Sequence, residues 1–185
     1  MGHRAGQDVR RTSFRTIRVS PRPSRRSLGW LFAGPLTIPV ALGRSGIRAD
    51  KREGDGGTPG GSFRPLRLWW RADRLIRPRT FLPVRRIGTA DAWCEDPADR
   101  GYNRPLRRSA TEPGDRLRRD DHLYDLIIEI DHNTRPRVAG RGSAVFIHVA
   151  RDSYGPTAGC ISLNRRDLKI LLARIAPKTR IKIHY

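Results

Sequence analysis

The stretch Gly142–Leu163, GSAVFIHVARDSYGPTAGCISL, contains an apolar run, a polar loop and a second, shorter apolar run. The first run, Ala144–Val149, carries His148 near its end, and Cys160 follows 12 residues after that histidine. The loop Ala150–Thr157 holds a glycine and a proline, which allow the chain to turn back. Short apolar runs bounded by turn residues are typical of buried strands. We therefore expect two strands that bring His148 and Cys160 to one edge of a sheet.

A cysteine near a histidine points to nucleophilic catalysis. A thiol attacks a carbonyl as the thiolate, so a catalytic cysteine needs a base or a cation nearby. We interpret Cys160 as a nucleophile of low pKa and His148 as its general base. Gly159 lets the backbone approach a substrate closely, and backbone amides in such a turn contribute on the order of 3 kcal/mol each to oxyanion stabilisation. The alternatives are a structural buried thiol and a histidine satisfied at a strand end.

Downstream of this stretch, the pattern changes to that of a helix. Asn164 is a typical N-cap, and leucines recur at helical spacing over Arg165–Ile175. Pro177 ends the predicted helix, and the alternating Arg180–His184 predicts a final strand.

Upstream, the apolar run 28–42 predicts a hairpin with a Gly34-Pro35 turn, followed by a glycine-rich loop over 43–61. Ser62–Trp70 and His122–Ile130 read as strands. Residues 71–121 show little regularity, which is typical of a functional insertion or lid. Together these patterns predict a mainly β fold with a short C-terminal helix.

The chain of 185 residues has room for one domain. We expect residues 1–27 to form a basic, disordered arm and residues 28–185 to form the folded domain. The run 28–42 follows basic residues as in a signal peptide, but Pro35 and Pro39 interrupt it. It is shorter than the roughly 20 apolar residues of a membrane span, so we predict no transmembrane segment.

The net charge of +20 comes almost entirely from arginine. Such a surplus suits anionic envelope polymers or a nucleic acid. The arginines are scattered, however, and no recognised nucleic-acid motif or basic stripe with interleaved aromatics is present, which disfavours nucleic acid. The alternative is a solvated surface without a polyanionic partner.

The chain has two cysteines, Cys94 and Cys160, and neither belongs to a CxxC pair. We therefore expect no metal site and no cofactor. We interpret Cys94 as structural, while a Cys94–Cys160 disulfide stays open at this point.

Several segments in order along the chain resemble the L,D-transpeptidase (YkuD-type) catalytic domain. They are Glu53–Gly60 (EGDGGTPG), Trp93–Pro97 (WCEDP) with Tyr102-Asn103, Gly142–Val149 (GSAVFIHV) and Pro156–Leu163 (PTAGCISL). The similarity runs from about Gly29 to Ile183.

This resemblance implies a β-sandwich with the active-site cleft at a sheet edge. It implies that Cys160 attacks the carbonyl of a diamino acid in a peptidoglycan stem peptide, that D-alanine leaves, and that an amine of a second stem takes the acyl group. His148 is then the base, the amides of Gly159 and Cys160 face the oxyanion, and Thr157 and Ala158 shape the loop. The implied location is the periplasm or cell envelope.

Two positions depart from the common family pattern. Ala158 stands where many members have His, and Ser162 stands where many have Arg. We expect Ser143 and Arg141 to help bind substrate in their place. The competing functions are an L,D-carboxypeptidase, in which water resolves the same acyl-enzyme, and a non-catalytic basic protein that binds anionic envelope polymers or nucleic acid.

Overall fold

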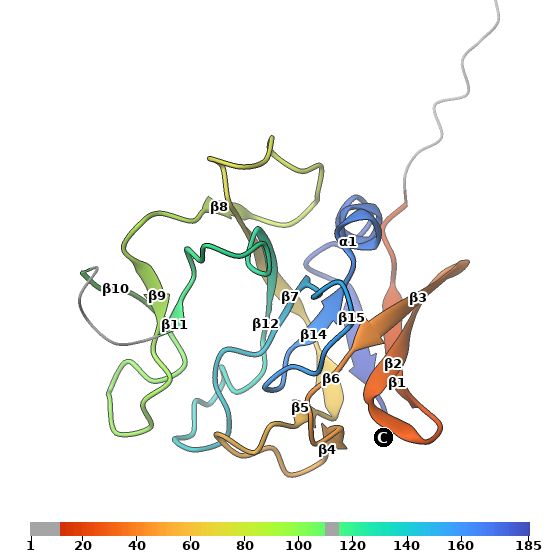
Figure 1. The fold of residues 1–185 in the computed structure, drawn as a ribbon, viewed down its shortest axis with the longest axis horizontal. Helices are drawn as coiled ribbons and strands as arrows, with labels where there is room; N and C mark the ends of the chain where they lie inside the picture. Colours follow the sequence, from red (N-terminus) through yellow and green to blue (C-terminus); the bar gives the residue numbers. More distant parts are fainter. Residues whose placement is uncertain (1–11, 110–114) are drawn as a thin grey trace, which may run out of the picture.

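The structure is a computed structural model that describes residues 12–109 and 115–185. The strands are β1 (Thr16–Arg22), β2 (Arg25–Ala33), β3 (Leu36–Ala41), β4 (Ile47–Arg48), β5 (Thr58–Pro59), β6 (Gly61–Phe63), β7 (Pro65–Trp70), β8 (Val84–Arg86), β9 (Asp91–Trp93), β10 (Pro105–Arg107), β11 (Asp115–Arg116), β12 (Leu126–Ile130), β13 (Phe146–Val149), β14 (Ile161–Leu163) and β15 (Arg180–Ile183). The helix is α1 (Arg165–Leu172). The predicted mainly β fold with a C-terminal helix is confirmed (Figure 1).

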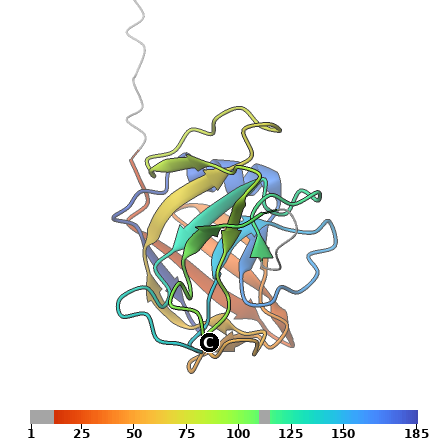
Figure 2. The same cartoon turned by 90° about the vertical axis from the view of Figure 1, so that its left-hand side faces the viewer.

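Ten strands form one curled sheet in the order β6-β15-β1-β2-β3-β14-β13-β12-β7-β8 (Figure 2). The pair β13 and β14 at its centre is parallel, with Ile147 opposite Ile161. Both isoleucines are fully buried in the larger core, which also contains the inward side chains of α1. Because side chains alternate along a strand, Phe146 and Cys160 lie on the opposite face, in a second apolar cluster. The central strands therefore separate the main core from the face that carries Cys160.

Helix α1 begins as the sequence predicts. The Asn164 side chain accepts a hydrogen bond from the Asp167 amide at 2.8 Å, which satisfies one of the free amides of the first turn. The buried Leu168, Leu171 and Leu172 follow the helical period. The helix ends at Leu172, earlier than the predicted Ile175, although Ile175 is itself buried in the core.

The middle segment has more structure than its sequence suggests. Strands β9, β10 and β11 form a small separate sheet beside the main one (Figure 1). Its Trp93 packs edge-on against Phe146 of β13, with ring centroids 4.9 Å apart. The small sheet thus lies over the face that carries Cys160.

The boundary expected at residues 27/28 is wrong. Strand β1 lies between β15 and β2, and β2 itself begins at Arg25. Ile17 and Val19 are fully buried, while Thr16, Arg18 and Ser20 beside them are polar. This short apolar alternation was hidden by the surrounding arginines, and it is stabilised by pairing with the adjacent β2 and with β15 from the far end of the chain. Residues 1–11 of the predicted arm lie outside the described residues.

The predicted hairpin over 28–42 is confirmed. Strands β2 and β3 pair antiparallel, with Ala33 opposite Leu36. Gly34 adopts a φ of +57° in the turn between them, a conformation that glycine accepts without strain.

Candidate active site

A cavity of about 240 Å³ opens where β13 and β14 begin, at the margin of the sheet. Cys160 forms part of its wall. The other residues that line it come from five separate segments of the chain: Arg44, Lys51, Glu53 and Gly54, then Glu95, then Tyr124, then Ser143, Ala144 and Val145, and finally Ala158 and Gly159. The cavity is therefore assembled by the tertiary fold around one cysteine.

The Cys160 thiol is held by the backbone of the neighbouring strand. Its Sγ donates to the Ala144 carbonyl at 3.2 Å and accepts from the Phe146 amide at 3.4 Å. The loop before it is fixed by Thr157, whose hydroxyl donates to the Cys160 carbonyl at 2.6 Å and accepts from the Gly159 amide at 3.1 Å. Thr157 thus holds the backbone of the loop that leads to Cys160. The Gly159 amide points to Thr157 in this structure, so it is not one of the free oxyanion donors that we expected.

Gly159 cannot be replaced by a larger residue without strain. Its φ is +151°, and an added Cβ would lie 2.8 Å from the Gly57 carbonyl oxygen. This close approach joins the nucleophile loop to the glycine-rich loop that the sequence singles out.

The glycine-rich loop is organised by Asp55. Its carboxylate accepts hydrogen bonds from Lys51 Nζ at 2.6 Å, from the Arg52 amide at 2.8 Å and from the Gly57 amide at 2.7 Å. Burial opposes ionisation, but the Lys51 and amide hydrogen bonds prevail and lower the pKa of Asp55. The ionised Asp55 thus holds both Lys51 and the backbone that packs on Gly159.

His148 lies deeper than we expected. It is opposite Ser162 in the parallel pair, whereas Cys160 precedes the first residue of β14. The two side chains lie on the same face of the sheet. Cys160 lies at the margin where both parallel strands begin, whereas His148 is the third residue of β13 and lies further inside the sheet. His148 is not among the residues that line the cavity.

The imidazole of His148 is oriented by the backbone. Its Nδ1 lies 2.8 Å from the Val149 carbonyl oxygen. A carbonyl can only accept, so Nδ1 carries the proton and Nε2 is left as the acceptor. The Tyr124 ring packs edge-on against the imidazole at 5.3 Å between centroids and against Phe146 at 6.2 Å. Tyr124 therefore lies beside the histidine and also lines the cavity of Cys160.

Burial keeps both candidate catalytic groups neutral. It raises the pKa of Cys160 to about 12 and lowers the pKa of His148 to about 4. The thiol of low pKa that we expected does not match this environment, because the charges of Asp115 and Glu95 add to the desolvation of the thiolate and the Phe146 amide and Lys51 offset it only in part. Attack by Cys160 then needs proton transfer to a base during the reaction.

Carboxylates and phenols occupy one side of the cavity. Tyr102 donates a short hydrogen bond to Glu53. Burial, together with the charges of Asp115 and Glu53, raises the pKa of Glu95 to about 7. Burial also raises the pKa of Tyr124, whose hydroxyl donates to Asp115 at 3.3 Å. Arg44 and the buried Lys51 bring positive charge to the same cavity.

The structure separates the two residues that we expected to bind substrate. Ser143 lines the cavity, and its buried hydroxyl makes no hydrogen bond within the described part of the chain. Arg141 instead pairs with Asp50, is half-exposed and is not part of the lining, so the structure does not bring it to the cavity with Ser143. Arg44 lines the cavity in its place, 3.3 Å from the Gly54 carbonyl.

Sequence reasoning missed the five lining residues that carry a charged or phenolic side chain: Arg44, Lys51, Glu53, Glu95 and Tyr124. Lys51, Glu53 and Glu95 fall in or beside segments that carry the family resemblance, which was the available signal. Tyr124 had none, since it lies just before a buried strand. The two cysteines are both free, so the question of a Cys94–Cys160 disulfide is answered.

The sequence matches the model of the L,D-transpeptidase catalytic domain (YkuD) over residues 22–183. The chain belongs to this family. The family predicted from the sequence motifs is confirmed. The match includes all of β2, whereas the predicted domain boundary at residues 27/28 falls within this strand. No curated protein shows significant similarity to the chain.

Solved L,D-transpeptidases are also similar to the chain. L,D-transpeptidase 3 from Mycobacterium tuberculosis is 14% identical with a TM-score of 0.41, covering 91% of this chain and 61% of that one. L,D-transpeptidase 1 from the same organism is 15% identical with a TM-score of 0.38 and the same coverages. The chain thus spans about three fifths of the length of these structures.

Two further features bear on partners. Across residues 12–109 and 115–185, no helix is long and apolar enough to cross a membrane. The same residues contain no group of three or more His, Cys, Asp and Glu side chains placed to hold a metal ion.

Proposed function

We propose that this protein is a cysteine acyltransferase that acts on peptidoglycan stem peptides in the cell envelope. The observation that carries the proposal is the position of Cys160, the family's cysteine, in the wall of a cavity lined by charges of both signs. In the proposed reaction, Sγ forms a thioester with the carbonyl of a diamino acid, and the bond from that carbonyl to the terminal D-alanine breaks. An amine of a second stem then attacks the thioester and releases the thiol.

The proton of the Cys160 thiol has to leave as the new bond forms. His148 is the proposed acceptor, because its Nε2 is unprotonated when Nδ1 donates to Val149. The two groups approach each other when substrate binds, since catalytic hydrogen bonds are often absent in free enzymes. The same proton then passes to the amine of the leaving D-alanine.

The developing oxyanion needs a donor in the cavity. With the Gly159 amide directed to Thr157, the Cys160 amide remains from the predicted pair. The unpaired Ser143 hydroxyl is a further donor available on the cavity wall.

The cavity lining supports a diamino acid as the acyl residue. The second amino group of a diamino acid is an ammonium at neutral pH, and Glu53 and Glu95 suit it. Arg44 suits a carboxylate of the substrate and takes the role that we first assigned to Arg141.

A carboxypeptidase that hydrolyses the same thioester is the second candidate. Glu95 favours it in one respect, because a carboxyl group with a pKa of about 7 can activate water at neutral pH. The two candidates differ only in the acceptor, so product analysis separates them.

Intact-mass spectrometry after incubation with a carbapenem tests the nucleophile. We expect one adduct per chain on the wild type, none on Cys160→Ala, and one on the control Cys94→Ala, which removes the other buried thiol. An adduct on folded Cys160→Ala, or none on the folded wild type, would contradict the assignment.

A stem tetrapeptide with a terminal D-alanine then tests the reaction. We expect D-alanine release to fall by about a thousandfold or more in Cys160→Ala, because the covalent step is lost. A cross-linked product that forms only when an amine acceptor is present supports transfer, and tripeptide alone supports hydrolysis.

A further inference from the structure

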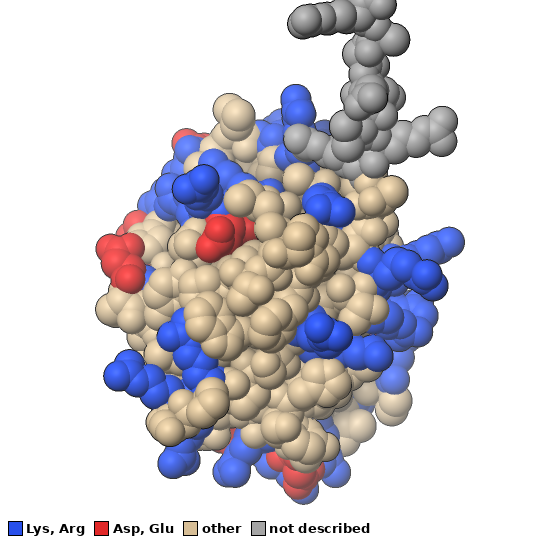
Figure 3. Space-filling model, turned by 90° about the vertical axis from the view of Figure 1, so that its right-hand side faces the viewer, with Lys and Arg blue, Asp and Glu red and all other residues tan. Residues whose placement is uncertain are grey.

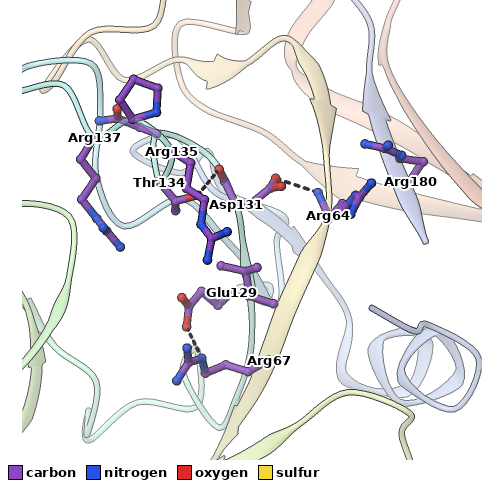
Figure 4. A pocket seen from close by; sticks show the side chains of 11 residues that line it. Arg64, Arg67, Glu129, Asp131, Thr134, Arg135, Arg137 and Arg180 are labelled. Carbon is purple, nitrogen blue, oxygen red and sulfur yellow. Dashed lines mark hydrogen bonds and ion pairs between the residues drawn. The ribbon is translucent and has the colours of Figure 1, made fainter. Parts of the chain in front are cut away.

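A second and larger pocket, of about 650 Å³, lies away from the cavity of Cys160 and shares no lining residue with it. Figure 4 shows its walls: the entry to β7, the turn that follows β12, and the first residue of β15. Five arginines line it: Arg64, Arg67, Arg135, Arg137 and Arg180. Glu129 and Asp131 are the carboxylates of the lining, so three positive charges remain uncompensated within it.

The carboxylates of the pocket are largely engaged. Glu129 is buried, pairs with Arg67 Nε at 3.0 Å and also accepts from the Trp69 indole at 2.8 Å. Asp131 accepts from the backbone amide of Arg64 at 2.7 Å, so its bond is to the main chain and not to a guanidinium. One arginine of the five is therefore neutralised by an ion pair.

Three of the guanidiniums are available to a ligand. Arg64, Arg135 and Arg180 are exposed, and none of them forms an ion pair within the residues that the structure describes. Arg137 is exposed as well and donates through Nε to the Asn103 carbonyl at 3.1 Å. Burial and the neighbouring charges of Arg104 and Arg135 lower the pKa of Arg137, as expected where like charges are crowded.

The arrangement of these guanidiniums selects a ligand class. They come from three different elements and therefore reach the pocket from more than one of its walls (Figure 4). A planar carboxylate is satisfied by a single guanidinium fork, whereas a phosphate presents oxygens in several directions and accepts forks from more than one side. We propose that this pocket binds a polymer that carries closely spaced phosphate groups and has no nucleobases.

The lining also argues against a nucleic acid. Single-stranded nucleic acids are bound by basic grooves in which aromatic side chains stack on the bases. No aromatic residue lines this pocket. Its walls offer guanidinium forks, which match the oxygens of a phosphate chain, and no side chain on which a base could stack.

The site does not depend on the proposed acyl transfer. The apolar cluster that contains Cys160 also contains Trp69 and Trp93, whose ring centroids lie 6.3 Å apart in an edge-on contact. Glu129 of the second pocket accepts a hydrogen bond from the Trp69 indole. Trp69 thus connects Glu129 of the second pocket to the cluster around Cys160, although the two pockets share no lining residue. A bound polymer would hold the protein near its anionic surroundings and leave the cavity of Cys160 open.

Calorimetric titration of the full chain with tripolyphosphate at 50 and 250 mM NaCl tests the site. The key variant is Arg135→Gln with Arg180→Gln. The matched control is Arg25→Gln with Arg166→Gln, which removes the same charge from exposed arginines outside the pocket. We expect one molecule to bind per chain, with affinity about tenfold or more weaker in the first pair and within about twofold of wild type in the control.

Several results would overturn the proposal. An equal loss of affinity in both variant pairs would mean diffuse electrostatic attraction without a specific site. No binding to the wild type at 50 mM NaCl would mean that the pocket is not a phosphate site. Citrate binding as tightly as tripolyphosphate would overturn the phosphate class. A 12-nucleotide single strand that binds more tightly and is lost in Arg135→Gln/Arg180→Gln would assign the pocket to nucleic acid. Carbapenem acylation should be unchanged in both pairs, which separates failure of this site from failure of the proposed reaction.

Discussion

At the scale of single residues, His148 shows how burial sets chemical behaviour. The imidazole is enclosed by β13, β14 and the Tyr124 ring and donates only to the Val149 carbonyl. No ion pair to a carboxylate forms there among the described residues, and the Val149 carbonyl and the charge of Asp121 offset the cost of burying the charged form only in part. The protein thus keeps a neutral histidine beside a neutral thiol, which protects Cys160 from oxidation and ion pairing until a substrate enters.

This neutrality has a measurable effect on stability. The pKa of His148 is about 4 in the native state and about 6.5 when unfolded. Between these values the unfolded chain binds a proton that the native chain does not, so the free energy of unfolding falls as pH falls from 6.5 towards 4. The contribution of His148 is fully present above pH 6.5. By pH 4.5 it should have fallen by on the order of 2 kcal/mol.

Urea unfolding of the wild type and His148→Asn at pH 7.5 and 4.5 measures this effect. We expect the loss of stability between the two pH values to be smaller in the variant by on the order of 2 kcal/mol. The exposed His184, replaced by Asn, is the control and should lose as much as the wild type. An equal loss in His148→Asn would mean that the histidine is not held neutral.

At the scale of elements, Asn103 joins the small sheet to the active-site strand. Its side chain is buried, accepts from the Trp93 indole at 3.1 Å and the Ala144 amide at 3.2 Å, and donates to the carbonyls of His132 and Asn133. Its φ of +54° is one that asparagine tolerates better than most residues. Ala144 in turn accepts the Cys160 thiol hydrogen. One side chain therefore connects the covering sheet to the position of the nucleophile.

Asn103→Ala should destabilise the protein by about 3 kcal/mol, because it leaves several buried polar groups without partners. It should also slow carbapenem acylation at Cys160, since the Ala144 backbone loses its anchor. Asn164→Ala is the matched control: it removes a helix N-cap, costs about 1 kcal/mol and should leave the acylation rate unchanged. Thermal unfolding and timed intact-mass spectra give both quantities. Equal acylation rates in the two variants would rule out the positioning role of Asn103.

The sequence predicted some of these elements better than others. The hairpin of β2 and β3, the strand β12 and the capped helix α1 were recognisable because each carries its own apolar period or turn residues. Strands β9–β11 are two or three residues long and are stabilised by Trp93 and Leu117 packing on distant residues. No local pattern marks such strands, because their stability comes from tertiary contacts.

At the scale of the whole molecule, the charge of +20 is distributed over the surface. Figure 3 shows lysine and arginine side chains scattered around one face, separated by broad neutral areas. Surface ion pairs are worth about 0–1 kcal/mol each, and the positive surplus exceeds what the carboxylates can pair. Net repulsion among the arginines therefore destabilises the folded state at low salt.

We expect the melting temperature to rise by a few degrees when NaCl increases from about 10 to 150 mM, because the Debye length falls from roughly 30 to 8 Å. A variant with Arg25, Arg77, Arg79 and Arg166 replaced by Gln should show a smaller rise, since all four are exposed. Calorimetric melts at constant pH compare the two chains. A melting temperature that falls with salt would mean that the ion pairs outweigh the repulsion.

The sequence alone determined the fold class, the family and the identity of Cys160 and His148 as the candidate pair, because periodicity and motif order are local properties of the chain. Only the tertiary structure decided that His148 lies inside the sheet margin, that both groups are neutral, and that Arg44, Lys51, Glu53 and Glu95 surround the thiol in place of Arg141. It also decided that β1 belongs to the sheet. Burial, pKa and cavity lining arise from contacts between segments far apart in the chain, and a linear pattern does not contain those contacts.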